Sequence, residues 1–323
     1  MKAIRVHRPG APEVLLYEET PVGSLGYGEV LVRNHAIGVN YTDVYTRNGA
    51  FTPSDLPFTP GKEAAGEVLA VGDGVTDFAP GDRVAFVETL GAYAEQTVVP
   101  ARFLVHMPPS IDFATAAAAL PKGLTAQYLL RQTFRVEAGQ TILVHAAAGG
   151  VGSILTQWAK YLGTTVIGTV GSAEKAAIAR QNGCDHVINY NQEDFVSRVD
   201  EVTAGGRCHV VYDSVGAATF PGSLDCLQPF GYFVSFGFAS GKIPAFDIML
   251  LLEKGSLFAT WPGLTQYIHK RADLLTMSQE LFEVIASGAV KIPAPLELPL
   301  CVADESHRRL EARDTLGVTV LIP

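Results

Sequence analysis

The sequence predicts an α/β protein in which a doubly wound parallel sheet is inserted into a mostly β domain. Residues 140–261 alternate short Val- and Ile-rich runs with helical segments, which is typical of parallel strands joined by helical crossovers. Residues 1–124 instead hold short β-like runs separated by Gly- and Pro-rich turns, which is typical of a compact barrel-like unit. A last predicted strand, 318–322, needs a partner sheet, and the N-terminal β region is the natural one.

Six strands are expected in the inserted domain, with helices at 150–162, 173–182 and 193–203 between the first four. Gly163 and Gly183 stand where helix C-caps belong. Six strands in about 120 residues, joined largely by helices, indicate a Rossmann-type dinucleotide-binding domain. The strands are expected at 140–146, 164–169, 186–189, 208–213, 231–237 and 256–261.

The flanking regions predict the second domain. Its β-like runs are 29–33, 64–71 and 83–87, and its C-terminal part holds a helix that stops at Gly288, a helix at 305–313 and the strand 318–322. We therefore assign residues 1–124 and 263–323 to the mostly β domain and residues 125–262 to the dinucleotide-binding domain.

Composition excludes several classes of protein. The chain has 323 residues, 48% hydrophobic and 18% charged, and its 33 acidic and 24 basic residues give a net charge of −9. This excess repels a phosphate backbone, so general nucleic-acid binding is disfavoured. The N-terminus lacks the apolar region of a signal peptide, and no run reaches the roughly 18 apolar residues of a membrane span. We expect a cytoplasmic protein with four reduced, buried or half-buried cysteines.

The strongest motif is Ala147-Ala148-Gly149-Gly150-Val151-Gly152, directly after the first strand of the inserted domain. It fits G-x-G-x-x-G with Ala147 in the first glycine position. Gly149 lets the backbone approach a pyrophosphate, Gly152 lets helix and strand pack closely, and the helix N-terminus offers free N–H groups. Alone the glycines would indicate only a tight turn, but the surrounding strand and helix favour nucleotide binding.

The residues after the second strand favour NADPH over NADH. An NAD site places Asp or Glu about 20 residues after the fingerprint, whereas the window 168–172 holds no carboxylate. Glu174 is near, but Lys175 follows it on the opening turn of the next helix, where it suits a ribose 2′-phosphate. A solvated lysine is the alternative. Tyr190, just past the third strand, either lies against the adenine or packs at the sheet edge.

These motifs resemble those of the quinone oxidoreductase (ζ-crystallin-like) branch of the medium-chain dehydrogenase/reductase superfamily, over essentially the full length. The likeness is carried by 38–49, 61–66, 122–126, 145–152, 212–216, 234–237 and 320–323. It implies a GroES-like catalytic domain, a Rossmann domain, NADPH between them, and a homodimer. By position it implies cofactor contacts from Asn40, Tyr45, Thr125, Gly149, Gly150, Val151, Gly152, Gly171, Lys175, Tyr190, Ser214, Phe236, Ser240 and Arg313.

The resemblance also implies a site without metal. Zinc members of the superfamily carry a cysteine where Asn40 stands and a histidine where Lys62 stands, and many add a four-cysteine lobe. The four cysteines here, at 184, 208, 226 and 301, are too dispersed to suggest one site. Without a Lewis acid, alcohol dehydrogenation is disfavoured. Quinones and activated enones accept a hydride through their own conjugation.

Asn40 and Tyr45 are the expected catalytic residues. Asn40 is the N-cap of a short helix that ends at Gly49, and the resemblance favours a further role in orienting the nicotinamide or the substrate oxygen. Tyr45 shares a helix face with Tyr41 and is placed either to donate a hydrogen bond to a developing oxyanion or to line the cleft. Where close bacterial relatives carry a second tyrosine, this chain has Phe51.

Structural roles are expected for Glu63 and His145. A buried Glu63 would pair with a cation, and His145, at a strand end, would be hydrogen-bonded within the fold.

Three functions remain open. The first is NADPH-dependent reduction of a small quinone, and the second is reduction of an α,β-unsaturated aldehyde or ketone. The third, from another class, is an NADPH-binding structural or RNA-binding crystallin-like protein. Against the third stand the charge of −9 and the lack of an Arg/Lys-aromatic run.

Overall fold

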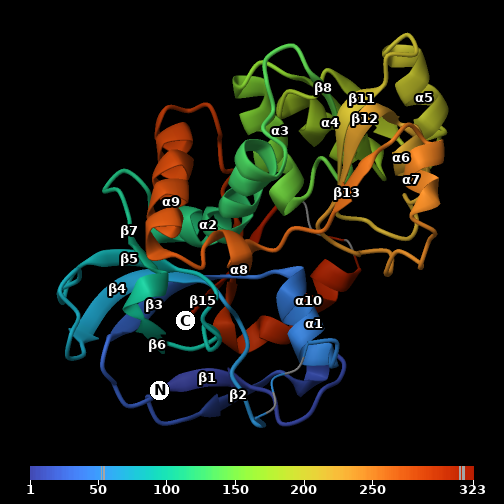
Figure 1. The fold of residues 1–323 in the computed structure, drawn as a ribbon. Coiled ribbons are helices and arrows are strands. Elements are labelled where there is room, and N and C mark those ends of the chain that lie inside the picture. The colour runs from blue at the N-terminus through green and yellow to red at the C-terminus, as the bar shows by residue number, and fades with distance from the viewer. Residues whose placement is uncertain (52, 54, 313, 315–316) are drawn as a thin grey trace. The chain divides into compact units, whose positions relative to one another are not determined.

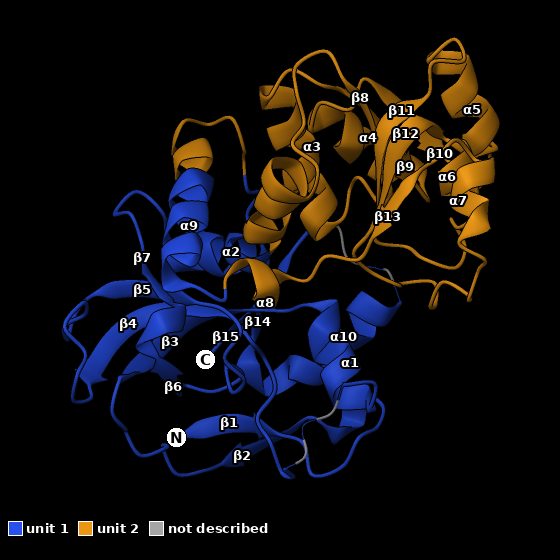
Figure 2. Ribbon diagram, in the orientation of Figure 1, with its two compact units in different colours: residues 1–121, 269–282, 292–323 blue, residues 122–268, 283–291 orange. Residues whose placement is uncertain are grey.

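The computed structural model (Figure 1) confirms the α/β fold and describes residues 1–51, 53, 55–312, 314 and 317–323. The chain forms two compact units (Figure 2): unit 1 is Met1–Pro121, His269–Phe282 and Ile292–Pro323, and unit 2 is Lys122–Ile268 and Glu283–Lys291. Residues 283–291 were expected in the mostly β domain. They join unit 2 because the backbone of Lys291 pairs with the side-chain amide of Gln157, at 2.9 and 3.1 Å.

Unit 2 is built on a six-stranded sheet in the order β10-β9-β8-β11-β12-β13. All neighbouring strands are parallel, and this is the strand order of a doubly wound dinucleotide-binding sheet. Ile142, Leu143 and Val144 in its centre are fully buried, which explains why these strands lack polar alternation. The strands are β8 (Thr141–Val144), β9 (Thr165–Val170), β10 (His186–Asn189), β11 (Cys208–Asp213), β12 (Leu227–Ser235) and β13 (Phe258–Thr260).

Short helices connect these strands. Ser172 and Asp194 begin two of them by accepting hydrogen bonds from first-turn N–H groups, as N-caps do. The helices are α3 (Gly150–Tyr161), α4 (Ala173–Gln181), α5 (Phe195–Val202), α6 (Gly222–Asp225), α7 (Met249–Glu253) and α8 (Leu264–Tyr267); a π-helical turn, Leu129–Thr133, follows α2 (Phe113–Tyr128).

Unit 1 holds a seven-stranded sheet in the order β14-β15-β3-β4-β5-β7, with β6 also paired to β3, and a two-stranded sheet of β1 and β2. The last strand pairs with β3 through Val320 and Gly38, which confirms the N-terminal β region as its partner. The strands are β1 (Lys2–Arg5), β2 (Leu16–Glu19), β3 (Glu29–Gly38), β4 (Ala64–Val71), β5 (Arg83–Phe86), β6 (Gln96–Pro100), β7 (Leu104–His106), β14 (Leu296–Pro299) and β15 (Thr319–Ile322).

Helices and short 3-10 turns complete unit 1. They are α1 (Tyr41–Asn48), the first part of α2, up to Pro121, most of α9 (Arg271–Ala286) and α10 (Ala303–Glu311), with turns at Pro12–Val14, Ala101–Phe103 and Leu300–Val302. The core of the unit packs Ile4, Ile37 and Phe86 from the strands against Leu300 and Ala303 at the start of α10. The C-terminal helix is therefore part of the N-terminal core.

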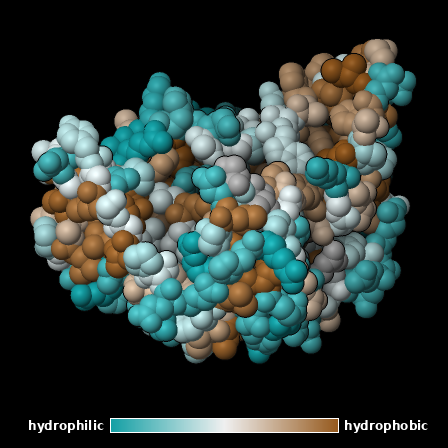
Figure 3. All heavy atoms as spheres, turned by 90° about the horizontal axis from the view of Figure 1, so that it is seen from below, coloured by the Kyte–Doolittle hydropathy of each residue, from teal (hydrophilic) through white to brown (hydrophobic). Residues whose placement is uncertain are grey.

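The surface carries both polar and apolar side chains. On the face drawn in Figure 3, hydrophobic side chains form separate patches between hydrophilic ones. Among the residues that the structure describes, no helix is long and apolar enough to cross a membrane.

Candidate functional site

The fingerprint forms a tight turn between β8 and α3. Ala146 takes a left-handed conformation, with φ of 53°, and its carbonyl oxygen accepts the N–H of Gly149 at 2.8 Å. A Cβ on Gly152 would overlap that same carbonyl, so only glycine fits there without a shift. The turn leaves the first N–H groups of α3 outside the helix ladder, as an anion site requires.

The missing first glycine of the fingerprint has a structural compensation. Ala147 stands in that position and is fully buried. Its methyl group faces Gly168 on β9, where an added Cβ would lie 2.7 Å from the Cβ of Ala147. Gly168 therefore makes room for the alanine, and Ala147 N–H still bonds to the carbonyl of Thr169, at 3.1 Å.

The predicted unit 2 cofactor contacts other than Thr125 lie where parallel strands end. The fingerprint follows β8, Gly171 and Lys175 follow β9, Tyr190 follows β10, Ser214 follows β11, and Phe236 and Ser240 follow β12. Because the carboxyl ends of parallel strands share one edge, these segments lie along a single rim of the sheet. Thr125 is half-buried on α2, and Arg313 lies outside the described residues.

The structure brings Tyr190 to the end of β9. The Tyr190 hydroxyl lies 2.5 Å from the position that a Cβ on Gly171 would take, so a larger residue there would displace the Tyr190 side chain. Nearby, Ser172 caps α4 by accepting the N–H of Lys175 at 3.2 Å. Lys175 is half-buried on the first turn, beside the position where a ribose carboxylate is missing.

Asp213 fixes the loop after β11, Ser240 joins that loop to the one after β12, and the sequence did not single Asp213 out. Its Oδ1 accepts the N–H groups of Val215 and Gly216 at 2.7 and 3.0 Å. The hydroxyl of Ser240 donates to the carbonyl of Val215, at 2.8 Å, and accepts the N–H of Ala218, at 2.9 Å. An aspartate at a strand end before Ser-Val-Gly was the available signal, since Asx turns favour that pattern.

His145 is held inside unit 2, in agreement with the expected structural role. It is 1% exposed, with Nδ1 at 2.8 Å from the Thr169 hydroxyl and Nε2 at 3.0 Å from the Ser223 hydroxyl. Ser223 in turn donates to Asp213 Oδ2 at 3.1 Å. Burial lowers the pKa of His145, which keeps the ring neutral.

Asn40 begins α1 in unit 1, and Gly49 ends that helix with φ of 102°, as predicted. The backbone N–H of Asn40 donates to Oδ2 of Asp43 at 2.8 Å, and its side-chain Nδ2 donates to Oε1 of Glu63. The carboxylate of the buried Glu63 accepts the Asn40 amide, because the turn after β3 places Asn40 against the start of β4. The cation expected beside Glu63 stays a prediction.

Tyr45 lies one turn further along α1, half-buried among aromatic rings. Its ring centroid is 6.0 Å from that of Tyr41 and 5.8 Å from that of Phe51, which is 58% exposed. Burial, with a smaller effect of Tyr41, raises the pKa of Tyr45 to about 12. Its hydroxyl therefore keeps its proton at neutral pH and has the chemistry of a hydrogen-bond donor.

Comparison with known proteins agrees with both units. Residues 26–109 match the alcohol dehydrogenase GroES-like domain and residues 150–276 the zinc-binding dehydrogenase family. A quinone oxidoreductase of Pseudomonas aeruginosa is 49% identical over 100% of this chain and 99% of its own. The chain belongs to the quinone oxidoreductase family.

Two further relatives show which substrates occur in the names of similar proteins. The crystal structure of Escherichia coli quinone oxidoreductase complexed with NADPH superposes with a TM-score of 0.98 at 45% identity, covering 100% of both chains. A 2-haloacrylate reductase of Burkholderia is 43% identical over 98% of each chain. The name of the first relative specifies a quinone as the substrate, and the name of the second specifies an unsaturated acid.

This member of the quinone oxidoreductase family carries different side chains at the two positions that bind zinc elsewhere in the superfamily. Lys62 replaces the histidine, and its Nζ lies 3.8 Å from Glu88 Oε2. An ammonium group repels a dication, and Asn40 bonds to Glu63. Within the described part of the chain, no cluster of three or more His, Cys, Asp or Glu side chains could hold a metal. Of the cysteines, Cys301 is exposed, contrary to expectation, and the others are buried.

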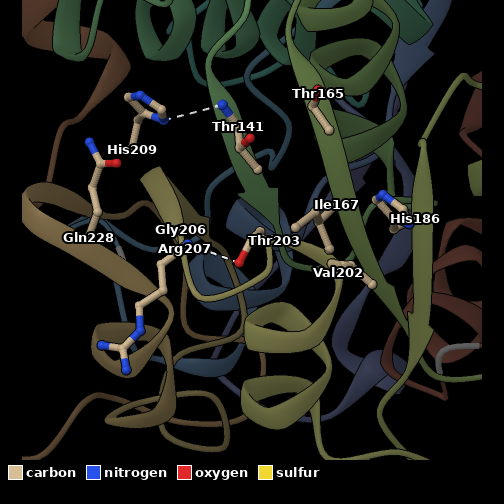
Figure 4. Close-up of a pocket in the computed structure, with 10 residues that line it drawn as sticks. All are labelled: Thr141, Thr165, Ile167, His186, Val202, Thr203, Gly206, Arg207, His209 and Gln228. Carbon is tan, nitrogen blue, oxygen red and sulfur yellow. Dashed lines mark hydrogen bonds between the residues drawn. The ribbon is translucent and has the colours of Figure 1, made fainter.

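A polar cavity of about 450 Å³ lies at the opposite edge of the unit 2 sheet (Figure 4). Thr141, Thr165 and His186, at the starts of β8, β9 and β10, line it together with Ile167, Val202, Thr203, Gly206, Arg207, His209 and Gln228. The ring of His209 accepts the N–H of Thr141 at 3.2 Å. Because dinucleotides bind at carboxyl ends of strands, this cavity is separate from the candidate cofactor site.

Proposed function

We propose that the protein is an NADPH-dependent quinone oxidoreductase. The observation that carries the proposal is the carboxyl rim of unit 2. There the fingerprint turn, with Ala147 in its first glycine position, is followed by a ribose position without a carboxylate. The full-length quinone oxidoreductase relatives support it. NADPH, when bound, supplies a hydride that a quinone accepts through its own conjugation.

The residues of this chain would bind and orient the reactants. The amino end of α3 holds the pyrophosphate, and Lys175 with Ser172 suits the 2′-phosphate. Asn40, fixed by Asp43 and Glu63, orients the nicotinamide or the substrate carbonyl. The protonated hydroxyl of Tyr45 donates a hydrogen bond to the oxygen on which negative charge develops.

The decisive experiment measures NADPH and NADH oxidation with a panel of quinones and enals, with product analysis. We expect quinone-dependent oxidation of NADPH that exceeds that of NADH, and activity that survives chelation. Saturation of an enal or haloacrylate with little quinone turnover would replace the proposal by the enone reductase function, which the 2-haloacrylate reductase relative favours. Tight NADPH binding without turnover of any acceptor would favour a structural role.

The substitution Lys175→Ala tests whether Lys175 contacts the 2′-phosphate of NADPH. Loss of one charge-assisted contact should weaken NADPH binding by about 1–3 kcal/mol and leave NADH nearly unaffected. Arg180→Ala, at the other end of α4, is the matched control and should alter neither affinity. Titration of cofactor fluorescence gives both dissociation constants. Equal losses for the two cofactors would show that Lys175 does not contact the phosphate.

We extend the proposal to a homodimer formed by unit 2. Strand β13 is the edge strand of the sheet. Phe258 on this strand is 49% exposed, and Ile248 and Leu252, at the preceding helix α7, are 75% and 58% exposed. An edge strand can pair with its own copy about a two-fold axis. Light scattering should show a dimer that Ile248→Lys dissociates and Tyr161→Lys, also exposed on unit 2, does not.

The proposal also includes a cytoplasmic location and no general nucleic-acid binding. The four cysteines are free thiols, which fits a reducing compartment, and the net charge of −9 disfavours nucleic acid.

A further inference from the structure

A chain of buried polar side chains in unit 1 begins at helix α10. Arg47, 1% exposed, donates to both carboxylate oxygens of Glu311, at 3.0 and 2.7 Å. The same guanidinium lies 3.3 Å from Nδ1 of His307. On the far side of the imidazole ring, Nε2 lies 3.1 Å from the hydroxyl of Tyr93. Three buried groups from distant parts of the chain are thus linked in series.

The series ends at the first turn of α1. The Tyr93 hydroxyl lies 3.2 Å from Oδ2 of Asp43, and this is the oxygen that accepts the backbone N–H of Asn40 at 2.8 Å. Asn40 is therefore fixed twice, through its backbone by Asp43 and through its amide by Glu63. We call Arg47, His307, Tyr93 and Asp43 the α1 relay.

All hydrogen bonds of the α1 relay are donated in the same direction, from Arg47 towards Asp43. A guanidinium only donates, so Nδ1 of His307 accepts from Arg47. Burial, together with the charge of Arg47, lowers the pKa of His307 to about 3, so the ring is neutral and carries its one proton on Nε2. Nε2–H donates to Tyr93, and the Tyr93 hydroxyl donates to Asp43. Each proton position is fixed by its neighbour.

Stability alone does not explain these residues. Apolar side chains of similar volume often stabilise a core as well as a buried polar network does, whereas a fully satisfied network fixes one arrangement. The arrangement fixed here is the start of α1, which carries Asn40 and, one turn on, Tyr45. Tyr41 adds a second tie from α1 to α10, through its hydroxyl and the carbonyl of Leu310 at 3.0 Å.

We propose that Asp43, Tyr93 and His307 are positioning residues that hold Asn40 in the geometry that hydride transfer to the substrate requires. The inference rests on the proposed function. It predicts that breaking the relay lowers kcat while leaving KM for NADPH nearly unchanged, because the expected pyrophosphate and ribose contacts belong to unit 2.

Tyr93→Phe tests the relay with little change of volume. A displacement of the reacting groups by part of an ångström should lower kcat about 10- to 100-fold. Thr97→Val is the matched control, since it also removes a buried hydroxyl in unit 1, one that donates to Gly91 and accepts from Asn34, at 3.0 and 2.8 Å. The control should lower the melting temperature but leave kcat within experimental error.

His307→Leu and His307→Gln provide a rescue test. The glutamine amide can donate to Tyr93 in place of Nε2–H, whereas leucine cannot. We expect His307→Gln to retain most of the kcat that His307→Leu loses. Equal losses in the two variants, or a loss in Tyr93→Phe no greater than in Thr97→Val, would overturn the proposal.

Hydrogen exchange of residues 37–48 supplies a readout that needs no substrate. Exchange should accelerate there in Tyr93→Phe and not in Thr97→Val. Wild-type protein that turns over no quinone would refute the proposed function, while the exchange result would still accept or reject the anchoring of Asn40. Unchanged exchange in Tyr93→Phe would reject it.

Discussion

The two units each contain a buried histidine that passes a hydrogen bond through a hydroxyl to an aspartate. In unit 1, His307 leads through Tyr93 to Asp43. In unit 2, His145 leads through Ser223 to Asp213. Both histidines have a lowered pKa because of burial. Each aspartate accepts a backbone N–H from a segment that carries expected site residues, so the two units support these segments by the same kind of arrangement.

The difference lies in how far apart the partners are in sequence. Tyr93 and His307 are separated by 214 residues, and the guanidinium that fixes the histidine tautomer belongs to Arg47, 260 residues away. In unit 2, His145 and Ser223 are only 78 residues apart, Ser223 follows Asp213 by 10 residues, and Thr169 follows His145 by 24. Unit 2 therefore supports its rim with neighbouring strand ends, whereas unit 1 needs the C-terminal helix to support its N-terminal one.

The largest effect expected from this comparison is that of Asp213→Ala. Its carboxylate accepts four hydrogen bonds, from the N–H groups of Val215 and Gly216 and from the hydroxyls of Thr219 and Ser223. The two hydroxyls keep carbonyl acceptors, Gly216 for Thr219 and Thr219 for Ser223, but the two N–H groups lose theirs, which should cost about 3 kcal/mol of unfolding free energy, measured in urea. Asp213→Asn keeps one acceptor oxygen and should lose less. Equal stabilities of the two variants would show that the contacts contribute little.

The second expected effect is a loss of folding stability in acid. Its size tests whether both histidines are neutral in the folded protein. The folded pKa of His307, about 3, is below the ordinary value of 6.5, so the neutral ring stabilises the fold above pH 6.5 and this contribution is lost as pH falls towards 3. The loss is about 1.4 kcal/mol per pH unit in that window, or about 2 kcal/mol by pH 5. His145 contributes with the same sign.

Urea unfolding at pH 7 and pH 5 measures this effect. His307→Gln cannot titrate, so the stability difference between the two pH values should shrink by about 2 kcal/mol relative to wild type. His145→Asn should shrink it as well. A variant whose pH dependence equals that of the wild type would mean that the histidine it replaces is charged, or equally accessible to protons, in the folded state.

The same comparison explains what the sequence could predict. The six strands of unit 2, its fingerprint and the missing ribose carboxylate are local signals, since strand hydrophobicity and glycine act within a few residues. The α1 relay joins positions hundreds of residues apart, and no local pattern marks such pairs. The cap at Asn40 was predicted, but its amide contact with Glu63 was not, because that contact depends on how β3 and β4 pair.

The misses in the fold have similar causes. Strand β14 reads Leu-Glu-Leu-Pro and lies mostly exposed at the sheet edge, so it lacked the apolar run of a central strand. Residues 283–291 belong to unit 2 through the tertiary contact with Gln157, which the end of a helix at Gly288 could not indicate.

The smallest expected effect is that of a substitution at Ser240. The family resemblance implies that Ser240 contacts the cofactor, and in the structure its hydroxyl bonds to the loop after β11 at the carboxyl rim. Ser240→Ala removes the bonds to Val215 and Ala218 and should cost about 1 kcal/mol of stability. Ser287 makes the same pair of bonds in unit 2, donating to the Val284 carbonyl at 3.1 Å and accepting the Ala289 N–H at 3.4 Å. Both variants should therefore lose similar stability, but only Ser240→Ala should weaken NADPH binding, since only its loop lies on the carboxyl rim. Similar affinities of the two variants for NADPH, in the fluorescence titration used for Lys175→Ala, would show that Ser240 does not contact the cofactor and only braces the loop after β12 against the loop after β11.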